Sequence, residues 1–522
     1  MTKNKDKQII NSNSIETFGI SAAKNTIIFV SSKIIGAFSS FILIIFLARF
    51  LGADNFGVYS IIFSFYLILG IGGSFGIGTM FRKKLTKHSN SMQIINSGYF
   101  IALIIGIIIF IFSFLSSNFF AGLYHQNISL DLKIVSISFL LFILYNLTLS
   151  CLVGLNKIKQ ASIANLFYYL SQLFAVIILV LLGYQIFGAI MGLLISIITG
   201  LIISLIYLIK SINLKFILPS KKILKEILSF SFPVMISNVS VLGLTNFAVM
   251  FLAVYVIPFK IGNYSAAFRL SRIIEVLLLS STFILLSTFS TIFNNKHLKE
   301  KLNAIFNNSL YYTLIFLIPL IVYLVSSAVP LSSLLFSSQY SLAPHYFQIM
   351  IIGFGILIIT NFSTTLLISY GDTKKFMKYQ LLIILIEFLL LLIFTPIFKI
   401  ISTIVILFII FPILSNIIFL KVLSNQFSIK LYPKILKLLI PGIILFAILY
   451  ISSYFIYSKI IIIVNLILVI VLYPILLVVF NLINQNNIDF IRKIENNIRV
   501  IKYIIEPLLK YTEFYLKIIQ NK

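Results

Sequence analysis

The sequence predicts an all-α integral membrane protein with fourteen transmembrane helices. Of its 522 residues, 60% are hydrophobic and only 10% are charged, and the mean hydropathy is +1.11. An ordinary soluble domain has about 25% charged residues. Long apolar runs recur along the whole chain and leave no room for a soluble catalytic domain.

Fourteen of these runs are long enough to cross a bilayer, because a helix needs about 20 apolar residues to span roughly 30 Å of hydrocarbon. Closed β-barrels would show short alternating segments instead, so the runs must be helices. The first run is too long for a signal-peptide core, and we interpret it as an uncleaved span. The runs are centred near residues 38, 68, 106, 143, 172, 197, 243, 278, 317, 358, 388, 411, 446 and 471.

The distribution of positive charge predicts that both termini are cytoplasmic, since Lys and Arg accumulate in short cytoplasmic loops. With the N-terminus inside, 32 of the 40 Lys and Arg residues fall in cytoplasmic segments, whereas the outer loops hold Lys133, Lys260, Lys399 and Lys459. We therefore expect a multi-pass protein of the cell (plasma or inner) membrane. Basic loops that meet anionic lipid explain the net charge of +27 without a nucleic-acid partner.

Two segments 205 residues apart resemble each other. FLARFLGADNFGVYSIIF (46–63) and FLAVYVIPFKIGNYSAAF (251–268) match at seven of 18 positions without a gap. Each copy closes one predicted span, crosses an outer turn and opens the next span. Because six spans separate the copies, the two halves share one orientation, as in transporters with parallel repeats around a central cavity. Spans 13 and 14 lie outside the two six-helix repeats.

This organisation divides the chain into six segments. The linker between the halves is polar, basic and contains Pro219. The tail carries an apolar stripe flanked by basic residues, which is typical of a helix in the membrane interface, and a partner-binding helix remains an alternative. The segments are a cytoplasmic N-terminal segment (1–25), an N-terminal six-helix bundle (26–208), a cytoplasmic linker (209–228), a C-terminal six-helix bundle (229–422), the additional helices 13 and 14 (423–482) and a basic amphipathic cytoplasmic tail (483–522).

A few charged side chains lie inside the predicted spans. An ionised group near the bilayer centre costs roughly 2.5–3.5 kcal/mol on insertion scales, so it usually faces a bundle interior or a wet cavity. Arg269 and Arg272 share a helix face with Glu275, and Lys33 lies in the inner half of span 1. A surplus of positive charge suits an anionic substrate, because guanidinium groups bind phosphate oxygens in pairs. A self-neutralising pair between Arg272 and Glu275 remains an alternative.

Three stretches are similar to a known family, the polysaccharide flippases of the multidrug/oligosaccharidyl-lipid/polysaccharide (MOP) exporter superfamily. They are the turn FLARFLGADNFGVYS, the glycine-rich end of span 2 that leads to MFRKKL, and IGNYSAAFRLSRIIEVL in span 8. The resemblance covers spans 1 to 12 in layout, and spans 13 and 14 fit the fourteen-helix members. The chain departs from the family at Asn246, because many members have an acidic residue late in span 7.

The resemblance implies a flippase that moves a polyprenyl-diphosphate-linked oligosaccharide from the cytoplasmic to the outer leaflet for surface polysaccharide or glycan assembly. It would work by alternating access through a basic central cavity in which Lys33, Arg269 and Arg272 receive the diphosphate. Its partners would be the lipid-linked oligosaccharide, membrane lipids and glycan assembly proteins, and H⁺ or Na⁺ would be coupled through Glu275, through Glu387 or through neither. Four amides would contact sugar hydroxyls or form interhelical packing bonds: Asn146, Asn165, Gln172 and Asn361.

Other transporter classes fit the sequence less well. A multidrug or cation exporter of the same superfamily commonly relies on buried acids, but residues 26–208 contain only Asp54 and Asp131, both in predicted outer loops. A major facilitator transporter would carry an acidic, glycine-containing motif where this chain has FRKKLTKHSN. The exporter and a flippase for another lipid-linked precursor, such as lipid II, remain alternatives.

The sequence shows no sign of an enzyme. A membrane glycan polymerase or ligase normally needs a large outer loop with catalytic groups, and the predicted outer loops are short. The four His residues are scattered and Cys151 is the single cysteine. We therefore predict no catalytic residue, no metal site and no cofactor.

Overall fold

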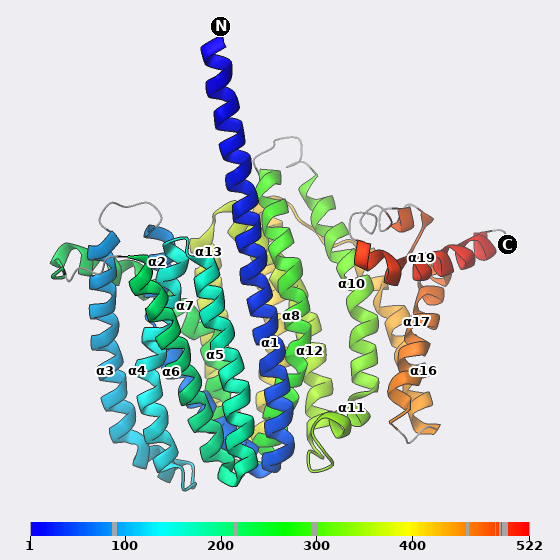
Figure 1. The fold of residues 1–522 in the computed structure, drawn as a ribbon. Helices are drawn as coiled ribbons and strands as arrows, with labels where there is room; N and C mark the ends of the chain where they lie inside the picture. The colour runs from blue at the N-terminus through cyan, green and yellow to red at the C-terminus, as the bar shows by residue number, and fades with distance from the viewer. Residues whose placement is uncertain are drawn as a thin grey trace. The chain divides into compact units, whose positions relative to one another are not determined.

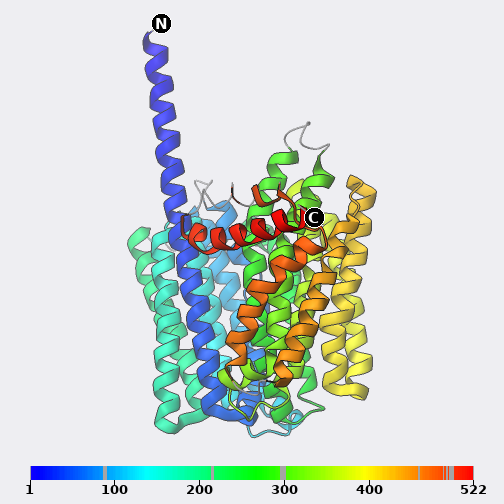
Figure 2. The same ribbon diagram turned by 90° about the vertical axis from the view of Figure 1, so that its right-hand side faces the viewer.

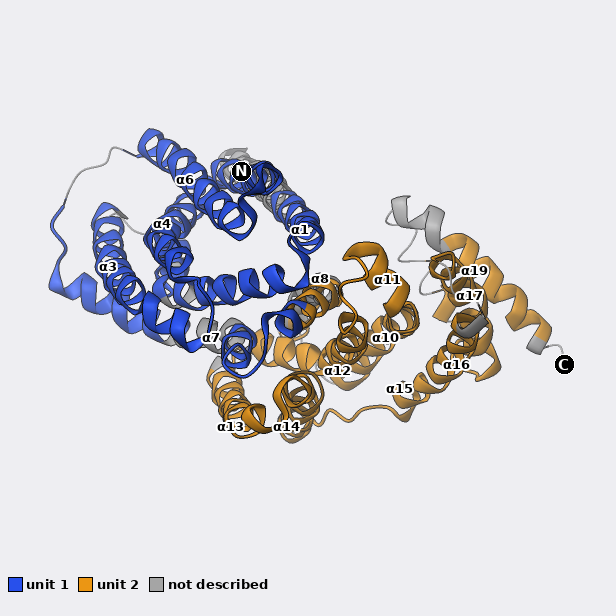
Figure 3. Ribbon diagram, turned by 90° about the horizontal axis from the view of Figure 1, so that it is seen from below, with its two compact units in different colours: residues 1–262 blue, residues 263–522 orange. Residues whose placement is uncertain are grey.

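A computed structural model describes residues 2–85, 91–212, 217–293, 301–455 and 459–520, the last range without residues 486, 490, 491 and 493–498. Side chains are described from Ser31 onward, with further gaps inside helices. The elements of the described part are all helices (Figures 1 and 2). They form two compact units, Met1–Gly262 (unit 1) and Asn263–Lys522 (unit 2) (Figure 3).

Nine helical segments in the described ranges are long and apolar enough to cross a membrane. The prediction of an all-α, multi-pass membrane protein is thus confirmed, whereas the count of fourteen crossings and the repeat stay predictions. Three of the nine segments contain 40, 54 and 54 residues. A single crossing needs only about 20 residues, so these three segments are long enough to cross twice.

The segment that begins with α13 (Thr373–Val405) turns back on itself at Lys399, whose φ is 55°. The hydroxyl oxygens of Thr395 and Thr403 lie 3.1 Å apart. In a continuous helix, eight residues would separate them by about 12 Å. The segment therefore consists of two antiparallel arms. Similarly, α1 (Thr2–Gly73) is interrupted at Gly52, where φ is 74°, a value that glycine adopts without steric cost.

A second antiparallel pair consists of α5 (Ile158–Leu179) and α6 (Gln185–Ser211), joined by the π-helical turn η1 (Val180–Tyr184). Small residues recur at every fourth position of α6, and all of them are buried: Gly188, Gly192, Ser196, Gly200 and Ser204. Gly188 packs against Leu179, and Gly192 packs against Val176. Small side chains let the two backbones approach closely, so this spacing holds the pair together.

Unit 1 is completed by α2 (Ile77–Lys84), α3 (Ser91–Leu123), α4 (Ser129–Gly154) and α7 (Lys221–Leu252). Helix α7 packs against α1, α2 and α3, and Lys84 of α2 forms an ion pair with Glu226 of α7. These contacts explain why the boundary between the compact units falls at the start of α8 rather than in the segment 209–228. The six predicted segments of the chain stay a prediction.

Unit 2 contains most of α8 and the helices that follow it. Buried Asn465 of α17 donates to Ser327 at 3.1 Å and accepts from Ser452 of α16 at 2.9 Å, and both helices pack against α10. The helices are α8 (Pro258–Phe293), α10 (Leu302–Ser326), α11 (Ala328–Leu335), α12 (Ala343–Tyr370), α13, η2 (Ile406–Ile410), α14 (Phe411–Phe427), α15 (Pro433–Lys437), α16 (Leu439–Phe455), α17 (Ile461–Val479) and α19 (Arg499–Gln520).

The two turns that resemble each other in sequence touch within unit 1. A Cβ atom added at Gly57 would overlap the carbonyl oxygen of Pro258, and one added at Gly262 would overlap the carbonyl oxygen of Ala53. The offset of 205 residues relates Gly57 to Gly262 and Ala53 to Pro258. The contact is therefore reciprocal, as at a two-fold interface. Glycine at both positions permits this backbone approach.

Candidate transport site

Unit 1 brings a lysine, an arginine and an amide together. Lys33 of α1 is exposed, and its Nζ lies 3.5 Å from Oδ1 of Asn165 on α5. Arg82 of α2 is close enough for its positive charge to act on Lys33. The Asn165 side chain is 4% exposed, and its Nδ2 has no hydrogen-bond partner among the described residues. Because its oxygen already faces a cation, this amide offers donors only. We call Lys33, Arg82 and Asn165 the cation cluster.

Aromatic rings fix α5 beside this cluster. Tyr168, one turn after Asn165, stacks on Tyr145 of α4 with 5.0 Å between the ring centroids, and it meets Tyr169 edge-on at 5.1 Å. Such pairs contribute roughly 0.5–1.5 kcal/mol beyond the area they bury. The stacked pair therefore holds the part of α5 that carries Asn165 against α4.

Sequence reasoning found Lys33 and Asn165 but missed Arg82. Arg82 lies in MFRKKL, where three successive basic residues were fully explained by the preference of cytoplasmic loops for positive charge. The signal was Arg82, the first residue of that triplet. Arg82 lies on α2, and its Nε donates to the Gly78 carbonyl oxygen at 3.3 Å.

The other predicted amides have mixed surroundings. Asn146 donates to a backbone carbonyl of its own helix at 3.1 Å, Gln172 is buried and Asn361 is half-buried. Their contact with sugar stays a prediction. An amide that the sequence analysis passed over, Asn416 of α14, accepts from Thr360 of α12 at 2.6 Å. This bond packs two helices of unit 2 together.

The predicted arginines lie on α8 in unit 2, where Arg269 is half-buried and Arg272 is exposed. The side chain of Glu275 lies outside the described residues. A pair between Arg272 and Glu275 therefore stays a prediction, as does the convergence of these arginines with Lys33 in one cavity.

Glu387 of α13 is the predicted acid that the structure describes. Its side chain is 4% exposed and lies in a small hollow beside η2. Tyr264 of α8 is fully buried and interacts electrostatically with Glu387, and its hydroxyl has no hydrogen-bond partner in the part of the chain that is described. A carboxyl group buried this way must take up a proton or a cation to avoid a large desolvation cost. The described ranges contain no group of three or more His, Cys, Asp and Glu that could hold a metal ion.

Pro412 explains the π-helical turn next to Glu387. Proline has no N–H to donate to the carbonyl of Phe408, four residues earlier, and its ring would clash with that carbonyl in an α-helix. The wider turn η2 relieves the clash, and the Phe408 carbonyl packs directly against Gly353 of α12. Single π-helical turns inside α-helices frequently occur at functional sites.

The arrangement of helices is that of the MOP-superfamily transporters. The chain is similar to the lipid II flippase MurJ in an inward closed conformation, with a TM-score of 0.72, 18% identity, and coverage of 87% of this chain and 98% of MurJ. It is also similar to an inward-facing multidrug resistance MATE family transporter of the MOP superfamily, with a TM-score of 0.65, 14% identity, and coverage of 76% and 98%.

A third similar structure is a MOP superfamily transporter from Pyrococcus furiosus Vc1 (DSM3638) described by the reverse polarity of its binding pocket. Here the TM-score is 0.51 at 16% identity, with coverage of 78% of this chain and 95% of the transporter. At such identities, the likeness shows the fold alone.

The family is shown by sequence. A family model described as "Polysaccharide biosynthesis protein" matches residues 22–293, which is more than half of the chain, and the chain belongs to this family. A search of curated proteins gives no significant match. The predicted family is thereby confirmed, and the similar structures show that the chain has the fold of MOP-superfamily transporters.

Proposed function

We propose that this chain is a flippase that carries a polyprenyl-diphosphate-linked oligosaccharide from the cytoplasmic to the outer leaflet, for surface polysaccharide or glycan assembly. The observation that carries the proposal is the cation cluster. Its two cations offer hydrogen-bond donors, as does the buried Nδ2 of Asn165, which has no partner among the described residues. Diphosphate oxygens accept from all of these groups. The polyprenyl tail can stay in lipid, so only the diphosphate and the sugars need a polar path.

The proposed topology has fourteen crossings, with both termini in the cytoplasm. The nine apolar segments, the interruptions at Gly52, Gly183 and Lys399, and the long helices α7 and α8 together account for this number. Two parallel six-helix halves would then rock about a site that binds the diphosphate through the cation cluster, Arg269 and Arg272.

The reciprocal glycine contact is the proposed closed state of the outer side. The backbones at Gly57 and Gly262 touch, and in the proposed closed state this contact would shut the route to the outer leaflet. The turns would separate when the substrate reaches the outer leaflet. The contact joins positions related by the repeat, which supports an axis of pseudo-symmetry along the membrane normal.

Glu387 is the proposed coupling residue, binding H⁺ or Na⁺. It is buried beside the π-helical turn and near the unpaired hydroxyl of Tyr264. Replacing Glu387 with Gln removes the charge and keeps the shape. We expect Glu387→Gln to abolish the dependence of transport on an ion gradient, as measured in proteoliposomes with imposed pH or Na⁺ gradients. Dependence equal to that of the unmodified chain would refute this role.

The test of the proposed cargo is export of lipid-linked glycan in cells that lack their own flippase. We expect Lys33→Gln, and the double variant Arg269→Ala/Arg272→Ala, to lose roughly tenfold or more of the export, because each charge-assisted hydrogen bond contributes about 1.5–3 kcal/mol. The lipid-linked glycan should accumulate on the cytoplasmic side. Lys133→Gln is the matched control, since Lys133 lies in α4, with its Nζ 5.8 Å from the ring of Phe114.

Undiminished export in these variants at matched membrane levels would refute the anion-binding site, and a drug or ion exporter would become the better proposal. Rescue of cells depleted of a lipid II flippase would instead identify another lipid-linked diphosphate as cargo. The match to MurJ motivates this second arm of the experiment.

A further inference from the structure

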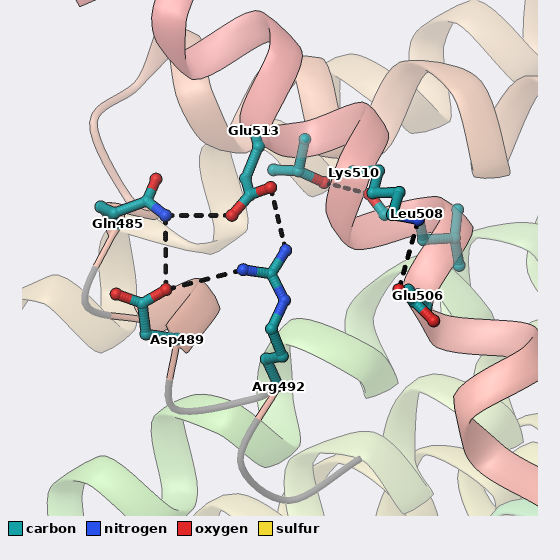
Figure 4. A network of polar contacts seen from close by, with 8 residues as sticks. Gln485, Asp489, Arg492, Glu506, Leu508, Lys510 and Glu513 are labelled. Carbon is teal, nitrogen blue, oxygen red and sulfur yellow. Dashed lines mark hydrogen bonds and ion pairs between the residues drawn. The ribbon is translucent and has the colours of Figure 1, made fainter. Parts of the chain in front are cut away.

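Helix α19 is tied to the segment that follows α17. The Arg492 guanidinium donates to the Glu513 carboxylate at 2.9 Å, and the Gln485 amide donates to Glu513 at 3.0 Å and to Asp489 at 3.3 Å (Figure 4). Hydrogen bonding from Arg492 is the main cause that lowers the pKa of Glu513. These bonds connect α19 to the segment 485–492 through side chains that accept and donate with full or partial charge.

One face of α19 is docked on unit 2. Leu509, Thr512 and Leu516 are each 5% exposed, and α19 packs against α17. Figures 1 and 2 both show α19 lying crosswise over the end of α17. Because α17 is an apolar segment that can cross a membrane, a helix across its end runs along the membrane surface.

A second apolar face of α19 is exposed. It consists of Pro507, Tyr511, Phe514 and Ile518; Tyr511 is half-buried, whereas Phe514 is 59% and Ile518 42% exposed. We call these four residues the exposed stripe. At about 100° per residue, the stripe lies roughly 160° around the helix from the docked face. Helix α19 therefore has apolar groups on two nearly opposite sides.

The polar residues lie midway between these two faces. Glu506, Lys510, Glu513 and Lys517 are centred about 100° from each apolar face, and the opposite side holds Leu508 and Tyr515. A helix in the membrane interface has this arrangement, with its polar side toward water. The docked face then lies to one side, against the protein, and the exposed stripe lies to the other side, toward lipid.

The length of α19 agrees with this placement. Its 22 residues span about 33 Å, whereas a helix beneath it is only about 10–12 Å wide. Figure 3 shows the C-terminal part of α19 extending past α16 and α17.

We propose that the exposed stripe inserts among the acyl chains of the adjacent leaflet, while Lys510 and Lys517 bind anionic lipid head groups. Interfacial helices bury their apolar side about 5–10 Å deep, and lysine side chains at the edge reach back to the head groups. The proposal rests on the proposed function only for the choice of the cytoplasmic leaflet. Its occupant is the lipid surface rather than a protein partner.

The absence of tryptophan in this chain gives a direct test, because a single introduced Trp is then the only indole. The full-length Phe514→Trp variant is reconstituted in vesicles of anionic phosphatidylglycerol brominated on its acyl chains. We expect strong quenching by bromine and protection from aqueous iodide. Glu506→Trp, on the polar side of the same helix, is the matched control and should show the reverse.

Four outcomes decide the proposal. The proposal is supported if bromine quenching of Phe514→Trp falls at least twofold when equally brominated neutral phosphatidylcholine replaces phosphatidylglycerol. It is also supported if the quenching falls at least twofold when Lys510 and Lys517 are both changed to Gln. Iodide quenching equal to that of Glu506→Trp overturns it and places the stripe in water. Protection from both quenchers also overturns it, because a protein surface, from a second copy or a partner, would then cover the stripe.

Discussion

The two turns at residues 46–63 and 251–268 make the same backbone contact in different surroundings. Gly57 and Gly262 have equivalent roles in it, since each approaches the carbonyl of the other turn. The second turn is also anchored, because Asn263 Oδ1 accepts from the backbone N–H groups of Leu342 and Ala343, at 3.0 and 2.9 Å, where α12 begins. The first turn has Val58 at the position related to Asn263 and cannot make such bonds.

The two arginines of α8 have no charged counterpart in the first copy of the repeat. An offset of 205 residues places Ser64 opposite Arg269 and Leu67 opposite Arg272. The contact that closes the turns is therefore shared by both copies, whereas the groups proposed to bind cargo belong to one copy each. The comparison teaches that the proposed closure rests on a symmetric backbone contact, whereas the proposed substrate recognition rests on an asymmetric set of side chains.

The largest effect should come from breaking the symmetric contact on both sides. Gly57→Ala/Gly262→Ala places two methyl groups on opposing carbonyl oxygens, so the turns must separate, and we expect transport to be lost. Separation is measured in a Cys151→Ser background by labelling Ser60→Cys, a buried position after the first turn, with an impermeant maleimide from outside. Labelling should rise severalfold.

Gly122→Ala is the control for this experiment, because no atom lies within 4 Å of a Cβ added there. If Ser60→Cys is labelled equally in both backgrounds, the glycine contact does not close the outer side.

A smaller effect should distinguish the role of the first turn from that of the second. Gly262→Ala should impair transport more than Gly57→Ala, because the anchored second turn cannot shift to relieve an overlap that costs roughly 1–3 kcal/mol. Adding Asn263→Ala frees the second turn and should bring the two single variants to similar rates, while the unpaired N–H groups lower thermal stability. Equal rates with Asn263 intact would contradict the anchoring role.

A further, moderate effect should distinguish the tyrosines that the repeat relates. Tyr264→Phe removes the hydroxyl beside Glu387, and we expect it to shift the ion concentration for half-maximal transport by a few-fold, the equivalent of about 1 kcal/mol. Tyr59→Phe, the repeat-related change, should leave this concentration unchanged. A shift of the same size in both variants would show that the Tyr264 hydroxyl has no specific role in ion binding.

The smallest effect concerns pH. At the C-terminal end of α12, Asp372 accepts hydrogen bonds from Gln426 and from the backbone of Lys375. Desolvation opposes these bonds, yet they prevail together with the Lys375 charge and lower the pKa of Asp372. A lowered pKa stabilises the fold above about pH 4, the usual carboxyl value, and the contribution is lost as the pH falls through the lower folded value.

Asp372→Asn should therefore lower the melting temperature slightly at pH 7, and the difference from the unmodified chain should shrink as the pH falls below about 4. The measurement is thermal unfolding in detergent across this pH range. A difference that stays constant with pH would assign the effect to the lost α13 cap geometry rather than to the charge.

Features that depend on apolar length or repetition were predictable from sequence. Runs of about 20 apolar residues predicted the membrane helices, and the similarity of 46–63 to 251–268 identified the two turns that touch. The small residues at every fourth position of α6 were equally visible in the sequence, but the sequence analysis made no prediction from them. Gly188, Gly192 and Gly200 appear as ordinary glycines until the opposing helix is known.

Side-chain partners were less predictable, because they depend on which helices become neighbours. Nothing local in the sequence pairs Lys33 with Asn165, 132 residues later, or Thr360 with Asn416. Arg269 and Arg272 were identified from the free-energy cost of placing a charge in a membrane. That rule indicates that the surroundings are polar, but it does not identify the neighbouring residues. Arg82 was missed because a second rule, the charge bias of loops, already accounted for it.

The π-helical turn at Ile406–Ile410 also has an evolutionary consequence. A turn of this kind holds one residue more than the α-helical turn it replaces. Relatives that lack Pro412 could lose one residue here and revert to a regular helix, with every later side chain of α14 still facing the same neighbours. A deletion elsewhere in α14 would rotate the remaining helix by about 100°. In an alignment of relatives, a single-residue gap in this region should therefore occur at η2 and accompany the replacement of Pro412.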